Sequence, residues 1–279
     1  MLKMEELNLK SVEQQNCARA KIGRPYHIRR PSRYRQNVLD MITVVGAQAV
    51  TAYIFADVDM SFIESIRREF DKEGRHLTVT AFVLKAIGIA QEGHPASRTF
   101  CLPFGRKVTY NNIVAGFTVE REVDGEPVVF FCEVEKPQSK SLSELSEVLR
   151  NCAEDDLMRE RNLRQQMIFA QFPWMLRRLI LALGLWFPAL RLICMGATFG
   201  LSSLGALGVR SVCGPSVCTS VFGLGVVEER AVLVNGDYTI KPMMTVSLSF
   251  DQRALDYGQA VLFLSEVKSL LEGSMKERL

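Results

Sequence analysis

The chain has 279 residues and a net charge of +3 at neutral pH. This length allows a sizeable hydrophobic core, and so small a net charge gives no indication of nucleic-acid binding. The seven cysteines include no Cys-x-x-Cys pair, so we predict reduced thiols rather than a disulfide framework. The three histidines are scattered, which disfavours a metal centre, and residues 1–8 contain no apolar core of a secretory signal. We therefore expect a cytoplasmic protein without bound metal or nucleic acid.

We predict one domain, residues 37–279, preceded by an N-terminal arm, residues 1–36. No Pro-, Ser- or Gly-rich linker divides the chain. Residues 24–35 of the arm are rich in arginine and contain interleaved aromatic side chains. Such a segment could bind phosphate groups, either of a nucleic acid or of a coenzyme, or could lie across a neighbouring subunit as an extended arm. We favour the second interpretation.

The first part of the predicted domain alternates strand and helix signals. Residues 50–58 form two alternating sets with a period of two, which predicts a strand with one covered face. A helix should follow, capped by Asp59 or Ser61 and ended by Gly74. Apolar residues at helical spacing predict a second helix over residues 78–93.

Later segments add a third helix, a hairpin and a final helix. A capping box at residues 141–144 predicts a helix that continues to about Gln166. The pair Asn235-Gly236 between two apolar runs predicts a two-residue hairpin turn. Apolar residues at helical spacing over residues 260–271 predict a last amphipathic helix. The chain is therefore of the mixed α/β class.

Residues 167–195 form a long apolar segment. The uncharged run between Arg178 and Arg191 is shorter than the roughly 20 apolar residues needed to cross a bilayer, so we predict no transmembrane span. We favour a pair of helices, broken at two prolines, that packs on the domain or over a substrate channel. The alternative is a peripheral contact with a membrane surface or an acyl chain through Trp174 and Trp186.

Five segments together resemble a known enzyme family. They are residues 112–119 (NIVAGFTV), 197–205 (ATFGLSSLG), 221–226 (VFGLGV), 241–251 (KPMMTVSLSFD) and 249–258 (SFDQRALDYG). Their sequences and their order are similar to those of the acyltransferase catalytic domain of the 2-oxo acid dehydrogenase complexes and of chloramphenicol acetyltransferase. The resemblance implies an α/β fold of the chloramphenicol acetyltransferase-like type, a mixed-sheet sandwich with covering helices. It also implies a homotrimer whose active sites lie between subunits.

The same resemblance assigns catalytic roles. Gln252 takes the position of the family's catalytic histidine. A histidine titrates near neutral pH and can act as a general base, whereas the amide of glutamine does not titrate. Ser202, with Ser203 as the alternative, takes the position of the hydroxyl that donates to the oxyanion of the tetrahedral intermediate.

Three further positions complete the expected site. Asp256 should hold the loop after the motif by pairing with an arginine near the start of the domain, either Arg33 or Arg35. Tyr257 stands where the family has glycine, and because glycine positions often need an unusual backbone conformation, we expect a reshaped loop. His94 stands where the family has a turn that lines the substrate channel, and of the two interpretations, a channel residue or an ordinary solvent-facing turn residue, we favour the second.

The missing base leaves three interpretations of function. The chain could move an acyl group between a thioester, of coenzyme A or of a carrier protein, and an unknown acceptor, at a rate reduced by about 10²–10⁴. It could be a non-catalytic scaffold or binding subunit of the same fold, or it could catalyse a reaction that needs no strong base. We favour the first, with the thioester as substrate and no tightly bound cofactor. Because the sequence contains no lipoyl-bearing domain, we expect a free-standing enzyme.

Overall fold

The computed structural model describes residues 31–123, 125–154 and 161–278. One compact unit spans Arg33–Leu279. This unit begins inside the segment predicted as an N-terminal arm, whose residues 1–30 lie outside the described residues. All the predicted site residues belong to this unit.

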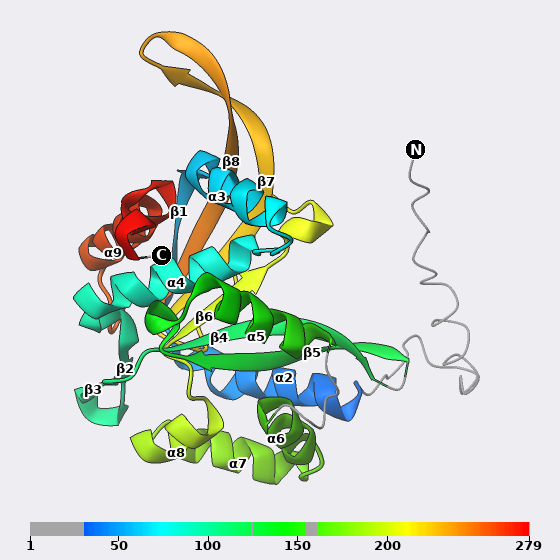
Figure 1. The fold of residues 1–279 in the computed structure, drawn as a ribbon. Helices are drawn as coiled ribbons and strands as arrows, with labels where there is room; N and C mark the ends of the chain where they lie inside the picture. The colour runs from blue at the N-terminus through cyan, green and yellow to red at the C-terminus, as the bar shows by residue number, and fades with distance from the viewer. Residues whose placement is uncertain (1–30, 124, 155–160, 279) are drawn as a thin grey trace, which may run out of the picture. The chain divides into compact units, whose positions relative to one another are not determined.

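A six-stranded mixed sheet forms the centre of the unit, in the order β1-β8-β7-β6-β4-β5 (Figure 1). Strand β6 runs parallel to both of its neighbours, β4 and β7, and the other neighbouring strands are antiparallel. A separate two-stranded sheet pairs β2 with β3. The strands are β1 (Thr51–Asp59), β2 (Thr99–Cys101), β3 (Lys107–Thr109), β4 (Val114–Val123), β5 (Glu126–Glu135), β6 (Phe199–Ser203), β7 (Ser220–Val234) and β8 (Asp237–Asp251).

Helices cover one face of the sheet and one of its edges. They are α2 (Arg33–Val44), α3 (Ser61–Lys72), α4 (Val79–Gly93), α5 (Leu142–Glu154), α6 (Arg161–Ala170), α7 (Trp174–Gly184), α8 (Pro188–Cys194) and α9 (Tyr257–Glu272). Helices α3, α4, α5 and α9 lie on the covered face, whereas α2 and α6 lie against the edge strand β5, with α7 and α8 beyond them (Figure 1). The sheet and its covering helices form the two layers that the predicted fold requires.

Local signals in the sequence place most elements correctly. Strand β1 buries Ala52 and exposes Tyr53, as the period of two predicts. The capping box at residues 141–144 forms at the start of α5. Asn235 and Gly236 join β7 to β8 with φ values of 54° and 98°, as a tight hairpin turn requires.

Two helix predictions change in detail. The helix predicted to reach Gln166 is described as α5 and α6, with residues 155–160 between them outside the described residues. The N-cap of α3 is Met60, so the predicted cap by Asp59 or Ser61 is wrong. Asp59 is the last residue of β1 and lies one position too early, although its carboxylate still accepts a hydrogen bond from the Ser61 N–H at 2.9 Å.

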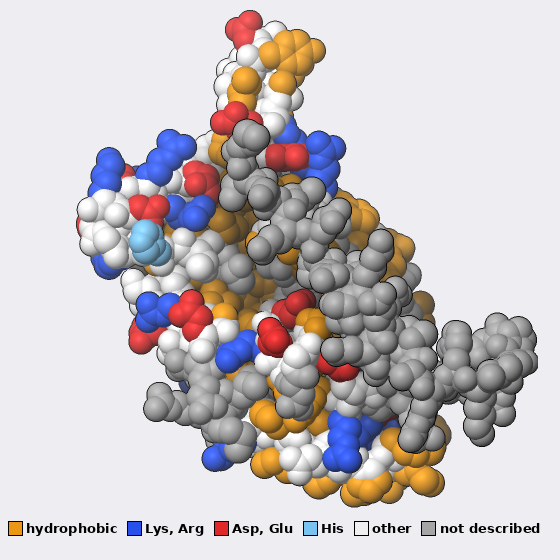
Figure 2. Space-filling model, turned by 90° about the vertical axis from the view of Figure 1, so that its right-hand side faces the viewer, with side chains coloured by type: hydrophobic (Ala, Val, Ile, Leu, Met, Phe, Trp, Pro, Cys, Tyr) orange, Lys and Arg blue, Asp and Glu red, His pale blue; other side chains and the backbone are white. Residues whose placement is uncertain are grey.

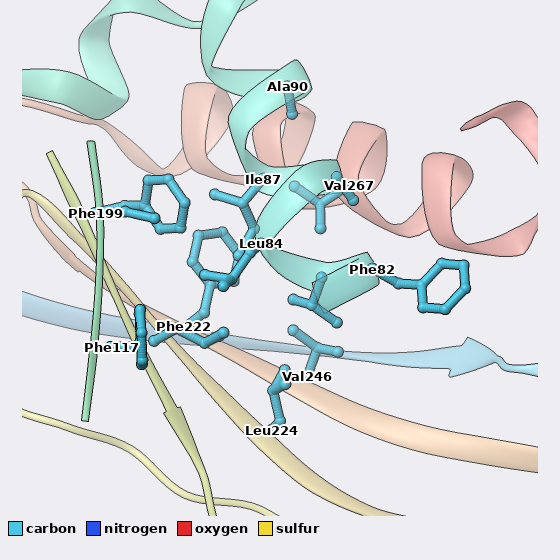
Figure 3. Close-up of a cluster of buried hydrophobic side chains, with 14 of the residues drawn as sticks. Phe82, Leu84, Ile87, Ala90, Phe117, Phe199, Phe222, Leu224, Val246 and Val267 are labelled. Atoms are coloured by element: carbon cyan, nitrogen blue, oxygen red, sulfur yellow. The ribbon is translucent and has the colours of Figure 1, made fainter. Parts of the chain in front are cut away.

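The main core lies between the sheet and helices α4 and α9 (Figure 3). Helix α4 is buried on almost every side, from Ala81 to Gln91. From the sheet, the rings of Phe199 and Phe222 meet edge to face at 6.5 Å, and Phe222 contacts Phe263 of α9 at 5.6 Å. Burial of each such side chain contributes about 1.5–3 kcal/mol. The core therefore fixes β6, β7 and α9, which flank the predicted site residues.

The opposite face of the sheet is polar along its centre. Side chains alternate along a strand, so the neighbours of core residues point to this face: Thr118, Glu133, Ser202, Ser247, Ser249 and Asp251. Chain from the β6–β7 connection crosses here, and the Val226 N–H donates to the Val209 carbonyl oxygen at 2.8 Å. Gly223 allows this close crossing, because a Cβ at that position would overlap the carbonyl oxygen of Val212.

The apolar segment 167–195 forms helices interrupted at Pro173 and Pro188, as predicted. Pro173 precedes α7 and Pro188 begins α8. Among the residues that the structure describes, no helix has the length and apolar character needed to cross a membrane. The segment packs on the domain through α2 and α6, which agrees with the favoured interpretation.

A buried ion-pair network attaches this segment to the first helix. The carboxylate of Asp40 in α2 is fully buried and accepts hydrogen bonds from the Nη2 of Arg177 at 2.8 Å and the Nε of Arg178 at 2.9 Å. Burial alone would raise the pKa of Asp40, but the hydrogen bonds from Arg178 and Arg177 outweigh it and hold this pKa below its usual value. Asp40 is therefore ionised across the neutral range.

We expect Asp40→Asn to lower the free energy of unfolding by about 3–5 kcal/mol, because it leaves the guanidinium of Arg177 buried without its counter-charge. Since the folded pKa is lowered, the stabilisation should be complete above about pH 3.9 and should be lost as the pH falls through the folded pKa. Urea unfolding at pH 7 and at acid pH measures both effects. Asp71→Asn removes only an exposed partner of His76 and should change stability little. Equal losses in the two variants would contradict the assignment.

Candidate active site

Asp251, the last residue of β8, organises the loop that leads to α9. Its carboxylate accepts hydrogen bonds from the backbone N–H of Val50 at 3.2 Å and of Arg253 at 3.1 Å, and it pairs with the Arg253 guanidinium at 2.7 Å. Its carbonyl oxygen accepts from the N–H groups of Ala254 and Leu255, both at 3.0 Å. The loop is thus held mainly by the carboxylate and the carbonyl oxygen of one residue, Asp251.

Gln252 has a fixed backbone and an exposed side chain. Its N–H donates to the carbonyl oxygen of Val50 at 2.9 Å, while its amide group faces solvent in the described unit. An amide donates and accepts hydrogen bonds but takes up no proton near neutral pH. Gln252 can therefore orient a substrate but cannot serve as a general base.

The structure gives Asp256 a role different from the predicted one. Its side chain caps α9 by accepting from the Gln259 N–H at 2.8 Å, and the Gln259 side chain accepts in return from the Asp256 N–H. The expected pairing with Arg33 or Arg35 is thus replaced by a capping box. The arginine that stabilises the loop is Arg253, three residues earlier in the motif.

Tyr257 does not distort the loop. It is the first residue of α9, and its φ angle is not positive. A helical residue needs no glycine, so the backbone at Tyr257 is unstrained. The Tyr257 ring is half exposed and packs edge to face on Phe250 at 5.4 Å. It adds an aromatic surface beside the loop.

Ser202 lies on the polar face of the sheet, in β6. Its side chain is partly buried and accepts a hydrogen bond from the Thr118 hydroxyl at 3.3 Å. With Thr118 as donor, the proton of Ser202 remains available for another acceptor. Ser203 is exposed and points to the other side of the strand. The geometry therefore favours Ser202 over Ser203 for the predicted donor role.

One chain does not bring Ser202 and Gln252 together. Ser202 pairs with Gly223 of β7, which pairs with Ser247 of β8. Gln252 follows Ser247 by five positions, and a strand rises about 3.3 Å per residue, so roughly 16 Å separates the two levels along the strands. A site that uses both side chains needs two copies of the chain.

His94 connects two helices. At the end of α4, its Nε2 lies 2.8 Å from a carboxylate oxygen of Glu266 in α9, and its ring packs on Phe263 at 5.4 Å. The side chain is only 20% exposed, so it is not the solvent-facing residue expected from its turn. These contacts commit His94 to the packing of α4 against α9.

Two thiols near the loop have a raised pKa and cannot act as general bases at neutral pH. Burial raises the pKa of Cys101, and the negative charge of Asp251 adds to that effect. Complete burial raises the pKa of Cys218 to about 12, although the positive charge of Arg191 opposes this shift. Both thiols therefore stay protonated at neutral pH. In the described ranges, no group of three His, Cys, Asp or Glu side chains is arranged to hold a metal ion.

Three residues at this face had no role in the sequence interpretation. Asp251 and Arg253 lie inside the motif segment, and their i, i+2 spacing was the available signal. Glu133 of β5 is different, because only the fold places it on the polar face. Burial raises its pKa, while the N–H groups of Gly196 and Ala197 donate to it and oppose the shift.

The C-terminal part of the chain is similar in sequence to known proteins. Residues 194–278 match the family model of the 2-oxoacid dehydrogenases acyltransferase (catalytic domain). Over 85 residues, the chain is 42% identical to the dihydrolipoyllysine-residue succinyltransferase component of the mitochondrial 2-oxoglutarate dehydrogenase complex of Saccharomyces cerevisiae. This match covers 29% of the chain and 18% of the yeast protein, so the chain spans less than a fifth of that relative.

The resemblance is confirmed. This chain resembles a 2-oxoacid dehydrogenase acyltransferase domain. Its structure has the fold of the dihydrolipoamide acetyltransferase of Azotobacter vinelandii, with a TM-score of 0.68 at 18% identity over 91% of this chain and 95% of that one. It also has the fold of the cubic core of a pyruvate dehydrogenase multienzyme complex, with a TM-score of 0.66 at 19% identity over 93% and 96% of the two chains.

The family match covers only part of the site, whereas the fold match covers almost the whole chain. The family segment includes Ser202, Gln252 and the loop that Asp251 holds, but it excludes Thr118 and His94. The fold match extends over nearly the whole described unit and confirms the predicted α/β class with its mixed sheet. The loop after β8 and the strand that presents Ser202 thus both lie within the matched family segment.

We expect Asp256→Ala to lower the free energy of unfolding by about 1 kcal/mol, because the first turn of α9 loses its cap. Asp256→Asn should keep most of this stability, since asparagine caps helices as well as aspartate does. Chemical unfolding of both variants measures the difference. An ion pair with an arginine would require the negative charge, so an equal loss in Asp256→Asn would overturn the capping role.

Proposed function

We propose that this chain is an acyltransferase-family protein that binds an acyl thioester, of coenzyme A or of a carrier protein, and moves the acyl group to an acceptor. The main support is the loop after β8, which contains Gln252. The carboxylate of Asp251 fixes the backbone of this loop through its bonds to Val50 and Arg253. The matched family segment covers this loop and Ser202. The sequence similarity to a succinyltransferase component points to the same class of reaction.

Ser202 would stabilise the charge that develops in the reaction. An oxygen, nitrogen or sulfur atom of the acceptor forms a bond to the thioester carbonyl carbon, and the C–S bond then breaks. The acceptor's proton passes to the departing thiolate sulfur. Between these steps the carbonyl oxygen carries a negative charge, and the Ser202 hydroxyl would donate to it while accepting from Thr118. Loss of one such donor typically costs about 10²–10³ in rate.

Gln252 would orient the acceptor without removing its proton. In the Azotobacter enzyme, a serine and a histidine have been studied for their part in the catalytic mechanism. These are the residue types that the resemblance places at Ser202 and Gln252. With an amide in the second position, positioning and oxyanion stabilisation remain but general-base catalysis is lost, so we expect slow transfer.

The alternative function is a non-catalytic scaffold or binding subunit of the same fold. Two observations favour it. The exposed amide of Gln252 cannot act as a base, and the thiols of Cys101 and Cys218 cannot replace a base because the pKa of each is raised. A subunit of this kind would retain the assembly surfaces and lose acyl transfer.

We infer a homotrimer in which Gln252 of one copy faces Ser202 of another. Within one chain the two side chains lie at different levels of the sheet. The far end of the β7–β8 hairpin projects beyond the sheet (Figure 1) and exposes the apolar side chains of Leu233, Tyr238 and Ile240. A two-stranded hairpin is only marginally stable alone, so a second copy would give these side chains a partner.

We expect Gln252→His to raise acyl transfer by about 10²–10⁴ and to add a pH dependence with a midpoint near 6.5, because imidazole supplies the missing base. Transfer from acetyl-CoA and longer acyl-CoAs, followed by thiol release, measures the rate. Gln252→Asn keeps the amide and should stay slow. If Tyr257 blocks access to the new imidazole, the further change Tyr257→Gly should restore the gain. If no variant transfers an acyl group and calorimetry shows no binding of acyl-CoA by the wild type, the scaffold alternative holds.

We expect light scattering to give three times the mass of one chain, and Ile240→Asp to shift the protein towards monomer, because the charge would be buried between subunits. Leu262→Asp on α9 changes a side chain of similar exposure and should leave the mass unchanged. A monomer at every concentration of the wild type would count against the inter-subunit site.

A further inference from the structure

The helices of segment 167–195 have the reverse of the usual surface pattern. On α7, Arg177 is 3% exposed, whereas Met175 is 65% and Leu179 54% exposed. On α8, Arg191 is 7% and Ile193 78% exposed. A surface helix normally buries its apolar stripe and exposes its charges. Here the two arginines point inwards and the apolar stripe points outwards.

Aromatic side chains extend this surface at both ends of α7. Trp174 and Trp186 are each about half exposed. The ring of Phe104, which is 86% exposed in the β2–β3 connection, packs edge to face on Trp186 at 5.7 Å. Phe104 is held at a φ of 63°, a left-handed conformation that a bulky residue rarely adopts. We call Phe104, Trp174, Met175, Leu179, Trp186 and Ile193 the apolar face.

The charge around the apolar face is positive. Residues 161–195 contain neither aspartate nor glutamate. Arg177 and Arg191 are buried and add no charge to the surface, whereas Arg164 is exposed. The Arg178 guanidinium is 40% exposed and lies 5.4 Å from the centre of the Trp174 ring. Arg106 and Lys107 are exposed directly after the Phe104 turn. In Figure 2, hydrophobic and basic side chains gather at the lower end of the described unit, where Figure 1 places α6, α7 and α8.

We propose that the apolar face docks the protein on an anionic lipid bilayer. Tryptophan and phenylalanine side chains insert at the level of the headgroups, and exposed arginine and lysine side chains bind the lipid phosphates. No helix of the described chain is long enough to span the bilayer, so the contact is peripheral. A second copy of the chain fits the same face less well, because the basic side chains of the two copies would meet.

The test is sedimentation of the full chain with vesicles. Vesicles of phosphatidylcholine mixed with phosphatidylglycerol should bind the protein, and vesicles of phosphatidylcholine alone should bind it at least about tenfold more weakly. Raising the salt concentration should weaken the binding, because the headgroup attraction is screened. Met175→Glu and Ile193→Glu should each reduce binding to the mixed vesicles about tenfold or more, because each places a negative charge in the apolar contact.

Leu262→Glu on α9 is the matched control, since Leu262 is 64% exposed and lies on another helix. This variant should bind vesicles as the wild type does. Circular dichroism and light scattering confirm that each variant keeps the fold and assembly of the wild type. The proposal is overturned if the wild type binds neither vesicle, if Leu262→Glu weakens binding as much as Met175→Glu does, or if Met175→Glu dissociates an oligomer, which would assign the face to a second copy.

Discussion

The packing of α4 and α9 on one face of the mixed sheet is the contact on which the rest of the structure depends. Phe199, Phe222 and Phe263 link two central strands to the last helix. The alternation of side chains along the strands then forces their neighbours to the opposite face. Ser202 and Asp251 are polar-face residues for this reason. The core therefore determines which side chains lie on the candidate site, although no core residue takes part in the proposed reaction.

Fold and activity are supported by separate residues at the end of β8. Asp251 holds the loop backbone, Asp256 caps α9, and neither bond involves the side chain of Gln252. The side chain at position 252 can therefore vary without loss of the fold. For this reason the resemblance supports the fold more firmly than the reaction.

Two of the exposed apolar surfaces in the described part of the chain differ in their chemistry. The end of the β7–β8 hairpin exposes Tyr238 and Ile240 on strands, where backbone pairing and side-chain packing with another copy are both available. The helices α7 and α8 also expose apolar side chains, but their backbone groups are already hydrogen-bonded within each helix and cannot pair with another chain. A helix face of this kind fits a fluid partner such as a lipid surface, whereas a hairpin fits a protein partner of defined shape.

The sequence alone determined the elements that depend on neighbours along the chain. The hairpin at Asn235-Gly236, the capping box before α5 and the period of two in β1 follow from local backbone preferences, and the structure agrees with them. The motif segments also determined the fold class through their resemblance. The tertiary structure decided the pairings between side chains that are distant in sequence. Asp256 pairs with Gln259 only one helical turn away, in an Asp-x-x-Gln capping box that the sequence itself contains, whereas Asp40 pairs with Arg177 from another part of the chain. A pairing of the second kind depends on which helices the core brings side by side, and no pattern within one segment contains that information.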